Sequence, residues 1–392
     1  SRLLDVVTDP LIGVLSDRLR LPMGRRKPWM ILGVPLFVYA LWKVFVPGES
    51  ATPAYLAIWS ALLYLAFTMI DLPHKAWGAE LSHDYDERSR VTSWREAIST
   101  AGQVALLGSL VWLADRGIEE SGAQLRWIAT WVAVALPAMV LWCVWGVREG
   151  RPEVLVRKRP STMAGLRIVA RNPAFLRMIG CVLFFVSGIA VQGTLHRMIL
   201  ADVMGDESRF ATMILFENIA TLAGVPVWLW ISVRVGKHRA LIAAALWIAA
   251  LSLPLVGLRA GDTDLLVVLI VIRGSSFASI LFLANSMAAD VIDVDALEAG
   301  EQRSGLFFAV WGMVTKLSLT VGVLLGTTLP AAFGYEPSAN LMSPEIEMRL
   351  MAIYGLVPAG LMATGVLFLV NFPITRERHA TVQLALAKLR SS

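Results

Sequence analysis

Ten predominantly apolar stretches, each long enough to cross a lipid bilayer, limit what this chain of 392 residues can fold into. A helix that crosses the hydrocarbon core needs about 20 mostly apolar residues. The stretches lie at 29–47, 54–72, 95–114, 127–147, 175–195, 210–232, 239–258, 264–287, 305–329 and 349–371. The opening segment 1–16 adds an eleventh, which is short at its start. We therefore predict an all-α polytopic membrane protein with about eleven spans.

The composition supports a membrane location and argues against a globular enzyme. Hydrophobic residues make up 56% of the chain and charged residues 17%, with a mean hydropathy of +0.64, whereas soluble domains are about a quarter charged. The net charge of +5 does not indicate nucleic-acid binding, because the basic residues are concentrated in particular loops. Cys143 and Cys181 both lie in apolar stretches and suggest no disulfide framework. We expect the lipid bilayer as a partner and no nucleic acid.

Lysine and arginine alternate between loops, which predicts the orientation of the chain, because cytoplasmic loops carry an excess of these residues. The loop over 16–29 and the long connection over 148–177 are rich in arginine, whereas the loop over 46–54 has no basic residue. We predict that the basic loops and the C-terminal tail are cytoplasmic, in the plasma membrane (the inner membrane of a bacterium). Eleven spans then start the chain on the outside, and one further helix would place both termini inside.

Similar motifs recur in two halves of the chain. Glycine-led basic motifs begin at Gly24 and Gly236, which are 212 residues apart, and acidic motifs begin near Glu80 and Asp290, which are 210 apart. Repeated halves are typical of transporters that bind their solute between them. We expect an N-terminal helix bundle over 1–147, a cytoplasmic central loop over 148–174, a C-terminal bundle over 175–371 and a cytoplasmic tail over 372–392.

Asp5 and Asp9 are two carboxylates in the apolar opening segment, and their spacing of four puts them on one helical face. Carboxylates at membrane depth are costly unless they face a cavity and hold a cation. Thr8 and Thr68 can add hydroxyl ligands of the kind that hard cations prefer. Because two carboxylates in one site can also share a proton, the sequence leaves Na⁺ and H⁺ both open.

Three further charges lie inside predicted spans. Lys316 is about eleven residues into its stretch, so it either pairs with the acidic cluster when no cation is bound or lines a water-filled cavity. Arg273 and Glu217 either pair across the second half and face the cavity, or mark places where the span ends lie closer to water.

Several motifs resemble a known transporter family. Gly13, Asp17-Arg18 and Gly24-Arg25-Arg26 resemble the signature after the second helix of major facilitator superfamily transporters. More specific motifs resemble the glycoside–pentoside–hexuronide:cation symporters, the melibiose-carrier-like group: Asp5-Val-Val-Thr-Asp9-Pro10, Gly24-Arg-Arg-Lys-Pro-Trp29, Asp71-Leu-Pro73, Gly78-Ala-Glu80-Leu, Arg88-Ser-Arg90 and Ala289-Asp290-Val-Ile-Asp-Val-Asp295 followed by Gly305-Leu-Phe-Phe308. The resemblance implies the major facilitator fold, a monomer of two six-helix bundles, with the first helix missing from this chain.

The resemblance also implies roles for particular residues. The cation site would be Asp5, Thr8, Asp9 and Thr68, with Thr8 in place of the family's asparagine. Asp71 and Arg95 would contact the solute, and Lys75 stands where the family has a stacking tryptophan, with Trp77 two residues on. Lys316 matches the lysine of helix eleven and would couple charge. Lys75 argues against a neutral galactoside and favours an anionic or acidic-sugar solute, unless it pairs with Asp71.

Charged residues in the basic loops have acidic partners in both halves, which positive-inside topology alone does not explain. We expect them to form a cytoplasmic gate that is closed in the outward-facing state. Its predicted members are Asp17, Arg18, Arg25, Arg26, Glu80, Asp84, Arg88, Arg90, Asp290 and Arg303.

The sequence thus predicts a secondary active transporter: Na⁺- or H⁺-coupled symport of a sugar, glycoside or uronide-like small molecule by alternating access. The coupling ion is the only cofactor expected, with no transition metal, since five scattered histidines lack ligand spacing. The alternative on the same scaffold is a lysolipid or amphiphile symporter. A membrane-embedded enzyme would need a catalytic constellation that the sequence does not contain.

Overall fold

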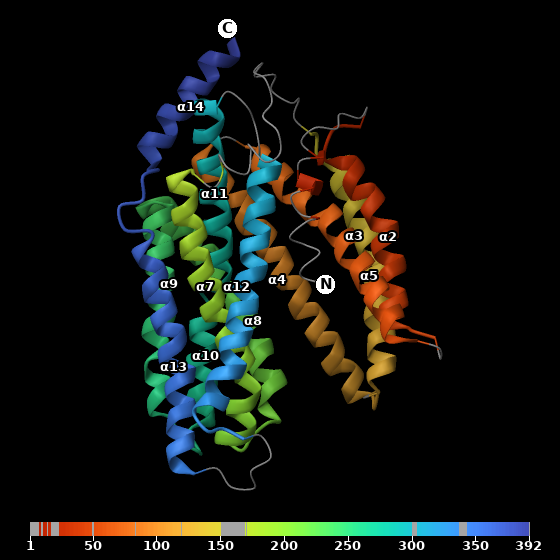
Figure 1. Ribbon diagram of the computed structural model, residues 1–392, viewed down its shortest axis with the longest axis vertical. Helices are drawn as coiled ribbons and strands as arrows, with labels where there is room; N and C mark the ends of the chain where they lie inside the picture. The colour runs from red at the N-terminus through yellow and green to blue at the C-terminus, as the bar shows by residue number, and fades with distance from the viewer. Residues whose placement is uncertain are drawn as a thin grey trace.

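The computed structural model describes residues 8, 11–13, 15–16, 23–48, 51–82, 84–118, 120–149, 169, 171–299, 304–336 and 343–391. Their regular structure is helical (Figure 1), as the apolar stretches predicted. Most of the opening segment 1–16, the expected eleventh span, lies outside this part of the chain, as does most of the central loop.

Within the described part of the first half there are four long helices. They are α2 (Lys27–Phe45), α3 (Pro53–Glu80), α4 (Tyr85–Asp115) and α5 (Ser121–Gly146). Local sequence sets where α3 begins: the Thr52 side chain accepts a hydrogen bond from the Tyr55 amide at 3.1 Å. Pro53 follows in the first turn, where a missing amide hydrogen costs little.

The second half is longer and contains two irregular helices. Its elements are α7 (Pro173–Met198), a π-helical turn (Ile199–Val203), α8 (Arg209–Val235), α9 (Lys237–Ser252), a 3₁₀ turn (Pro254–Gly257), α10 (Thr263–Gly274), α11 (Phe277–Ala299), α12 (Ser304–Ala332), α13 (Pro344–Leu367) and α14 (Arg376–Ser391). One predicted span, 264–287, is therefore two helices, α10 and α11, separated at Ser275–Ser276.

Within the described residues, ten helical segments are long and apolar enough to cross a membrane, one for each predicted stretch. Several helices extend beyond their apolar stretch. The stretch 95–114, for example, lies inside α4, which begins at Tyr85. An apolar stretch predicts only the part of a helix that lies in the hydrocarbon core of the membrane. The polar turns before it belong to the same helix and make the same backbone hydrogen bonds.

The two halves meet mainly through α4, which packs against α8 and α11, and α3 also contacts α12. In Figure 1, α4 runs obliquely between α2, α3 and α5 on one side and the second half on the other. We call the end of the molecule where α14 lies the α14 end. There the C-termini of α3 and α11 and the N-termini of α4 and α12 come together.

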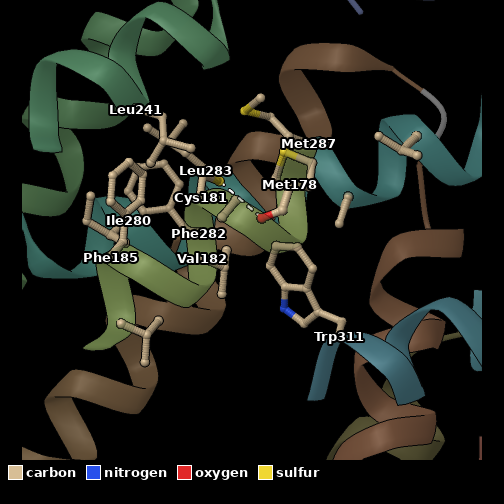
Figure 2. Packing of buried hydrophobic residues seen from close by; sticks show 14 of the residues in the cluster. Met178, Cys181, Val182, Phe185, Leu241, Ile280, Phe282, Leu283, Met287 and Trp311 are labelled. Atoms are coloured by element: carbon tan, nitrogen blue, oxygen red, sulfur yellow. Dashed lines mark hydrogen bonds between the residues drawn. The ribbon is translucent and has the colours of Figure 1, made fainter. Parts of the chain in front are cut away.

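Buried hydrophobic side chains from several helices form the core of the second half. Met178 and Phe185 of α7, Leu241 of α9 and Phe282 of α11 lie in this cluster, shown in Figure 2. Trp311 of α12 belongs to the same cluster and is 6% exposed. This tryptophan is therefore part of the core.

Two glycines bring α12 and α7 into close contact. A Cβ atom added at Gly322 would lie 2.5 Å from the Ser187 carbonyl oxygen, and one at Gly326 would lie 2.9 Å from the Thr194 Cβ. Small residues spaced four apart let membrane helices approach this closely. The sequence Gly-x-x-x-Gly over 322–326 thus explains why these helices pack so tightly.

Gly322→Val is expected to destabilise the protein by about 1–3 kcal/mol, because the new side chain must push α12 away from α7. The melting temperature in detergent should fall accordingly. Gly193→Val, on α7 with open space around its Cβ position, is the matched control and should change it little. Equal melting temperatures for the two variants would contradict the tight contact.

Glu149, just after α5, binds the start of α2. Its carboxylate accepts the main-chain amides of Arg25 at 2.8 Å, Arg26 at 3.0 Å and Lys27 at 3.4 Å. Gly24 precedes them with φ +112°, and any Cβ there would lie 2.1 Å from the Glu149 carboxylate. Glycine is required at this turn, and the negative charge suits the helix N-terminus.

Candidate functional site

An ion pair lies inside the membrane-spanning helix α3. Lys75 Nζ is 2.7 Å from Asp71 Oδ2, and both side chains are 29% exposed. The spacing of four residues places them on one helical face. Charged side chains at membrane depth face a bundle interior or a water-filled space and not lipid. This pair is therefore the centre of the candidate solute site.

Arg95 reaches the same region from α4. Its charge, with that of His74, acts on the Asp71 carboxylate. The Arg95 Nη1 lies 3.9 Å from the Cβ position of Gly78, on the α3 face that also carries Asp71 and Lys75. Arg95 also contacts its neighbour Glu96 at 3.5 Å. The structure thus brings together three of the four residues predicted to bind the solute.

Trp77, the fourth predicted solute residue, lies on a different face of α3. It is 2% exposed and packs with Met30 of α2 and Val140 of α5. Lys27 Nζ lies 5.3 Å from the centre of its ring. The structure does not bring Trp77 to the Asp71–Lys75 pair, and its ring supports the packing of α2, α3 and α5 instead.

Two of the four predicted cation ligands are described. Thr68 lies on α3 three residues before Asp71 and is 3% exposed. Thr8 is helical and half-buried, and its Oγ1 is buried without a hydrogen-bond partner among the described residues. A buried oxygen of this kind is suited to bind a ligand. Asp5 and Asp9 lie outside the described residues.

Lys316 lies in α12, which packs against α7 and α3. Its side chain is half-buried and is not an isolated charge. This position inside a span is consistent with both sequence interpretations, pairing with acidic groups or lining a cavity.

Glu80, the last residue of α3, is the centre of one charged cluster at the α14 end. Arg25 Nη2 lies 2.8 Å from its Oε2, and Arg26 Nη2 lies 2.9 Å from its Oε1. Arg26 also donates to Ser16 at 2.8 Å and to Ser304 at 3.0 Å, and Ser304 donates to Glu80. Because Ser304 begins α12, this Glu80 cluster joins the two halves.

Asp290 of α11 is the centre of a second cluster. Arg88 of α4 places Nη1 3.1 Å from Asp290 and 2.5 Å from Asp293. Lys237 Nζ, from the start of α9, lies 2.6 Å from Asp290. All four side chains are at least nine-tenths buried. This Asp290 cluster is a second ionic contact between the halves.

Helix α14 lies against the Asp290 cluster. His379 Nε2 is 3.3 Å from Asp293 Oδ2, and Gln383 donates to the same oxygen at 2.5 Å. Arg376 forms an ion pair with Asp86 of α4 at 2.6 Å. The helix therefore contacts both halves where they meet.

Other predicted gate residues behave differently. Asp84 accepts the main-chain amides of Asp86 and Glu87 at 2.9 and 2.8 Å, so it caps the start of α4. The Arg90 side chain is exposed. Asp17, Arg18 and Arg303 lie outside the described residues. The predictions for the gate missed Asp293, His379 and Gln383. Asp293 could have been found from its place in the repeated acidic motif, but nothing in the tail sequence indicated where α14 docks.

Comparison with known proteins identifies the family. A family model described as MFS/sugar transport protein matches residues 1–376, which is nearly the whole chain. The chain belongs to this family. The predicted resemblance to the glycoside–pentoside–hexuronide:cation symporters is confirmed.

Individual relatives align along the full length of this MFS chain. YagG of Escherichia coli (strain K12), named as a putative glycoside/cation symporter, is 25% identical, covering 100% of this chain and 86% of the relative. Sodium-dependent lysophosphatidylcholine symporter 1 of Xenopus tropicalis is also 25% identical, covering 100% and 82%. A crystal structure of the E. coli fucose:proton symporter FucP, solved as a single-residue variant, aligns with a TM-score of 0.67 and 13% identity, covering 94% of this chain and 88% of that one. The chain is thus a multi-pass membrane symporter of the major facilitator fold and not an enzyme.

Proposed function

We propose that this MFS protein couples a cation gradient to the symport of a sugar, glycoside or uronide-like solute. The observation that carries the proposal is the partly exposed Asp71–Lys75 pair inside a span, with Arg95 beside it. These groups offer both acceptors and donors to a hydroxyl-rich molecule. Lys75 and Arg95 can also bind a carboxylate, which favours an acidic sugar over a neutral one.

The coupling ion, Na⁺ or H⁺, would bind at Asp5, Asp9, Thr8 and Thr68. Support comes from the buried, unpartnered Thr8 hydroxyl and from the position of Thr68 three residues before Asp71. A cation next to Asp71 would organise the solute site electrostatically. By linkage, the solute should then raise cation affinity by the same factor. Lys316 would compensate the acidic charge when the cation has left.

The Glu80 and Asp290 clusters would form the gate. We place the α14 end in the cytoplasm, because the basic loops lie there, and the protein as a monomer in the bacterial inner membrane. The ion pairs between halves at this end then correspond to an outward-facing state. They would break when the bundles rock, and this difference in contacts biases the equilibrium between the two states.

An amphiphile carrier is the second candidate. The Xenopus lysophosphatidylcholine symporter and the E. coli protein named as a glycoside/cation symporter are equally similar to this chain. Lys75 would suit the phosphate of a lysolipid as well as a carboxylate.

Uptake into proteoliposomes decides between these candidates. The purified full chain would be tested with radiolabelled raffinose, a phenyl glucuronide and lysophosphatidylcholine, each under an inward Na⁺ gradient, an inward H⁺ gradient or neither. We expect glucuronide uptake that requires one of the two gradients. Lysophosphatidylcholine uptake alone would favour the second candidate, and uptake that ignores both gradients would exclude symport.

Asp9→Asn is expected to abolish ion-driven uptake, because the cation loses a charged ligand and the remaining oxygens bind it weakly. Counterflow of solute without an ion gradient reports solute binding and should be less affected. Asp206→Asn, in the exposed turn before α8, is the matched control. Gradient-driven uptake that survives in Asp9→Asn would place the cation elsewhere.

A further inference from the structure

Four polar side chains from four different helices meet inside the second half. Arg273 of α10 donates from Nη2 to Glu217 Oε1 of α8 at 3.1 Å. His196 of α7 lies with Nε2 3.6 Å from Glu217 Oε2, and its Nδ1 is 2.6 Å from the Tyr354 hydroxyl of α13. The exposed fraction of each residue is 6% or less. Arg273 and Glu217 pair, as one sequence interpretation predicted, but both groups are buried in the bundle, whereas that interpretation also expected them to face the cavity.

The hydrogen bonding of this group, which we call the His196 site, is incomplete. Arg273 Nε and Nη1 have no hydrogen-bond partner among the described residues, and neither has Nε2 of Gln192, one turn before His196. A buried ion pair held by one direct hydrogen bond stabilises the packing of two helices only weakly. The cost of removing both charges from water offsets most of their attraction. Such a pair is better suited to exchanging partners than to holding helices together.

The His196 site touches two irregularities in the helices. Arg273 stands one residue before the end of α10, and the Thr221 hydroxyl donates to the Gly274 carbonyl at 2.8 Å. A Cβ at Gly274 would lie 2.6 Å from Glu217 Cγ, so Glu217 presses directly on the break between α10 and α11. The π-helical turn begins at Ile199, three residues after His196. Broken helices and π turns in transporters and enzymes often mark functional sites.

Other charged groups on the described helices around this site have partners of their own. Arg197, next to His196, pairs with Glu207 at 2.7 Å, and Arg349 of α13 pairs with Glu345 at 2.5 Å. Asp202 of the π-helical turn accepts a hydrogen bond from Tyr335 at 2.5 Å.

Residues 317–332 of α12 and 277–289 of α11, which also pack beside α7, contain no titratable side chain. Arg209 and Asp264 lie at the exposed ends of α8 and α10 and pair with each other at 3.2 Å. The Glu217 carboxylate therefore has two neighbours that can carry positive charge: Arg273 always, and His196 when it is protonated.

We propose that the His196 site is a proton-binding site, separate from the cation site of the first half. One proton adds to the free imidazole nitrogen of His196, no covalent bond breaks, and the charge of the site rises by one. Both ring nitrogens then donate: Nδ1 to the Tyr354 oxygen, and Nε2 to Glu217 across the present gap of 3.6 Å. Glu217 then interacts with both His196 and Arg273, and its ion pair with Arg273 weakens. The contact of Glu217 with the break between α10 and α11 loosens as a result. Histidine is suited to this role because its ring can accept a second proton, and the Glu217 carboxylate beside it favours the charged form.

Nitrogen NMR of the full chain in nanodiscs, labelled with ¹⁵N-histidine, tests the proton site without any solute. The chain has five histidines, and His196→Gln assigns the signal by removing it. If that variant does not fold, Tyr354→Phe assigns it by shifting it. We expect His196 to change from one protonated ring nitrogen to two as the pH is lowered through and below the unperturbed histidine value of about 6.5. Glu217→Gln should weaken this protonation about tenfold or more, because the proton loses an opposite charge. A His196 signal that keeps one form throughout would overturn the proposal.

The link to transport rests on the proposed function and has its own readout. We expect the rate of uptake to change with pH on the acidic side as His196 becomes protonated. This change should disappear in His196→Gln and remain in His238→Gln, because His238 is a half-buried residue at the start of α9. Identical profiles for both variants would remove the link to transport. If no gradient drives any uptake, the proposed function fails, and the NMR titration still decides whether His196 binds a proton.

Discussion

Arg88→Ala should open the α14 end of the protein. The guanidinium of Arg88 bridges Asp290 and Asp293 across the two halves and is 3% exposed. Removing one partner of a buried ion pair costs about 3–5 kcal/mol. If most of this cost falls on the closed state, the open state should gain about a hundredfold or more in population.

Cysteine labelling measures the opening. Ser286 of α11 is fully buried and lies 3.2 Å from Ser89 of α4 across the contact between the halves. In a background without Cys143 and Cys181, a membrane-impermeant maleimide should react with Ser286→Cys far faster when Arg88 is replaced. Arg90→Ala, two residues away and exposed, is the matched control and should leave labelling slow. Equal rates in both would show that the Asp290 cluster does not keep the gate closed.

Asp71→Asn should weaken solute binding about 30-fold. Lys75 Nζ, now 2.7 Å from the carboxylate, would be left in the span without its counter-charge. The full penalty of a broken buried pair does not apply, because both side chains are 29% exposed. A cost of about 2 kcal/mol corresponds to about a 30-fold loss of affinity.

Equilibrium binding to detergent-purified protein would measure this loss with the solute that the uptake screen identifies. The double variant Asp71→Asn with Lys75→Met removes both charges and should recover part of the affinity if the stranded lysine causes the defect. An additive effect of the two changes would instead mean that each residue contacts the solute independently. Glu96→Gln, which keeps the size of a neighbouring side chain, serves as the control for a general change in local charge.

The sequence predicted the helices well because their cause is local. Each apolar stretch must satisfy its backbone hydrogen bonds internally in lipid, so length and hydropathy alone locate a span. The break after Gly274 could not be predicted, since Gly274 and the two serines that follow it are tolerated inside membrane helices. It depends on α8, where a Cβ at Gly224 would lie 1.8 Å from the Ser275 carbonyl oxygen.

Side-chain partners were harder to predict than helices. The chain turns by about 100° per residue in a helix, so Lys75 faces Asp71 while Trp77, two residues on, faces α2 and α5. Nearness in sequence was misleading for the tryptophan. Asp84 was grouped with the gate by charge, yet its oxygen is used by the start of α4, a local role that any acidic residue before a helix can adopt.

Contacts between distant segments could be predicted from the sequence only where both residues belong to a recognised motif. Arg25, Arg26 and Glu80 were expected to meet because they belong to repeated motifs, and the structure brings them together. The docking of α14 on Asp293 follows from no motif. It requires the path of the chain after α13, which a single sequence does not contain.

The hydrogen bonds that the Glu149 carboxylate accepts from the start of α2 have a mechanical consequence. They tie the chain just after α5 to the start of the neighbouring helix α2, so that α2 and α5 must move together. A force on the chain beyond Glu149 is therefore transmitted to α2 as well as to α5. The two helices respond as one rigid body, and any displacement of that chain moves both of them.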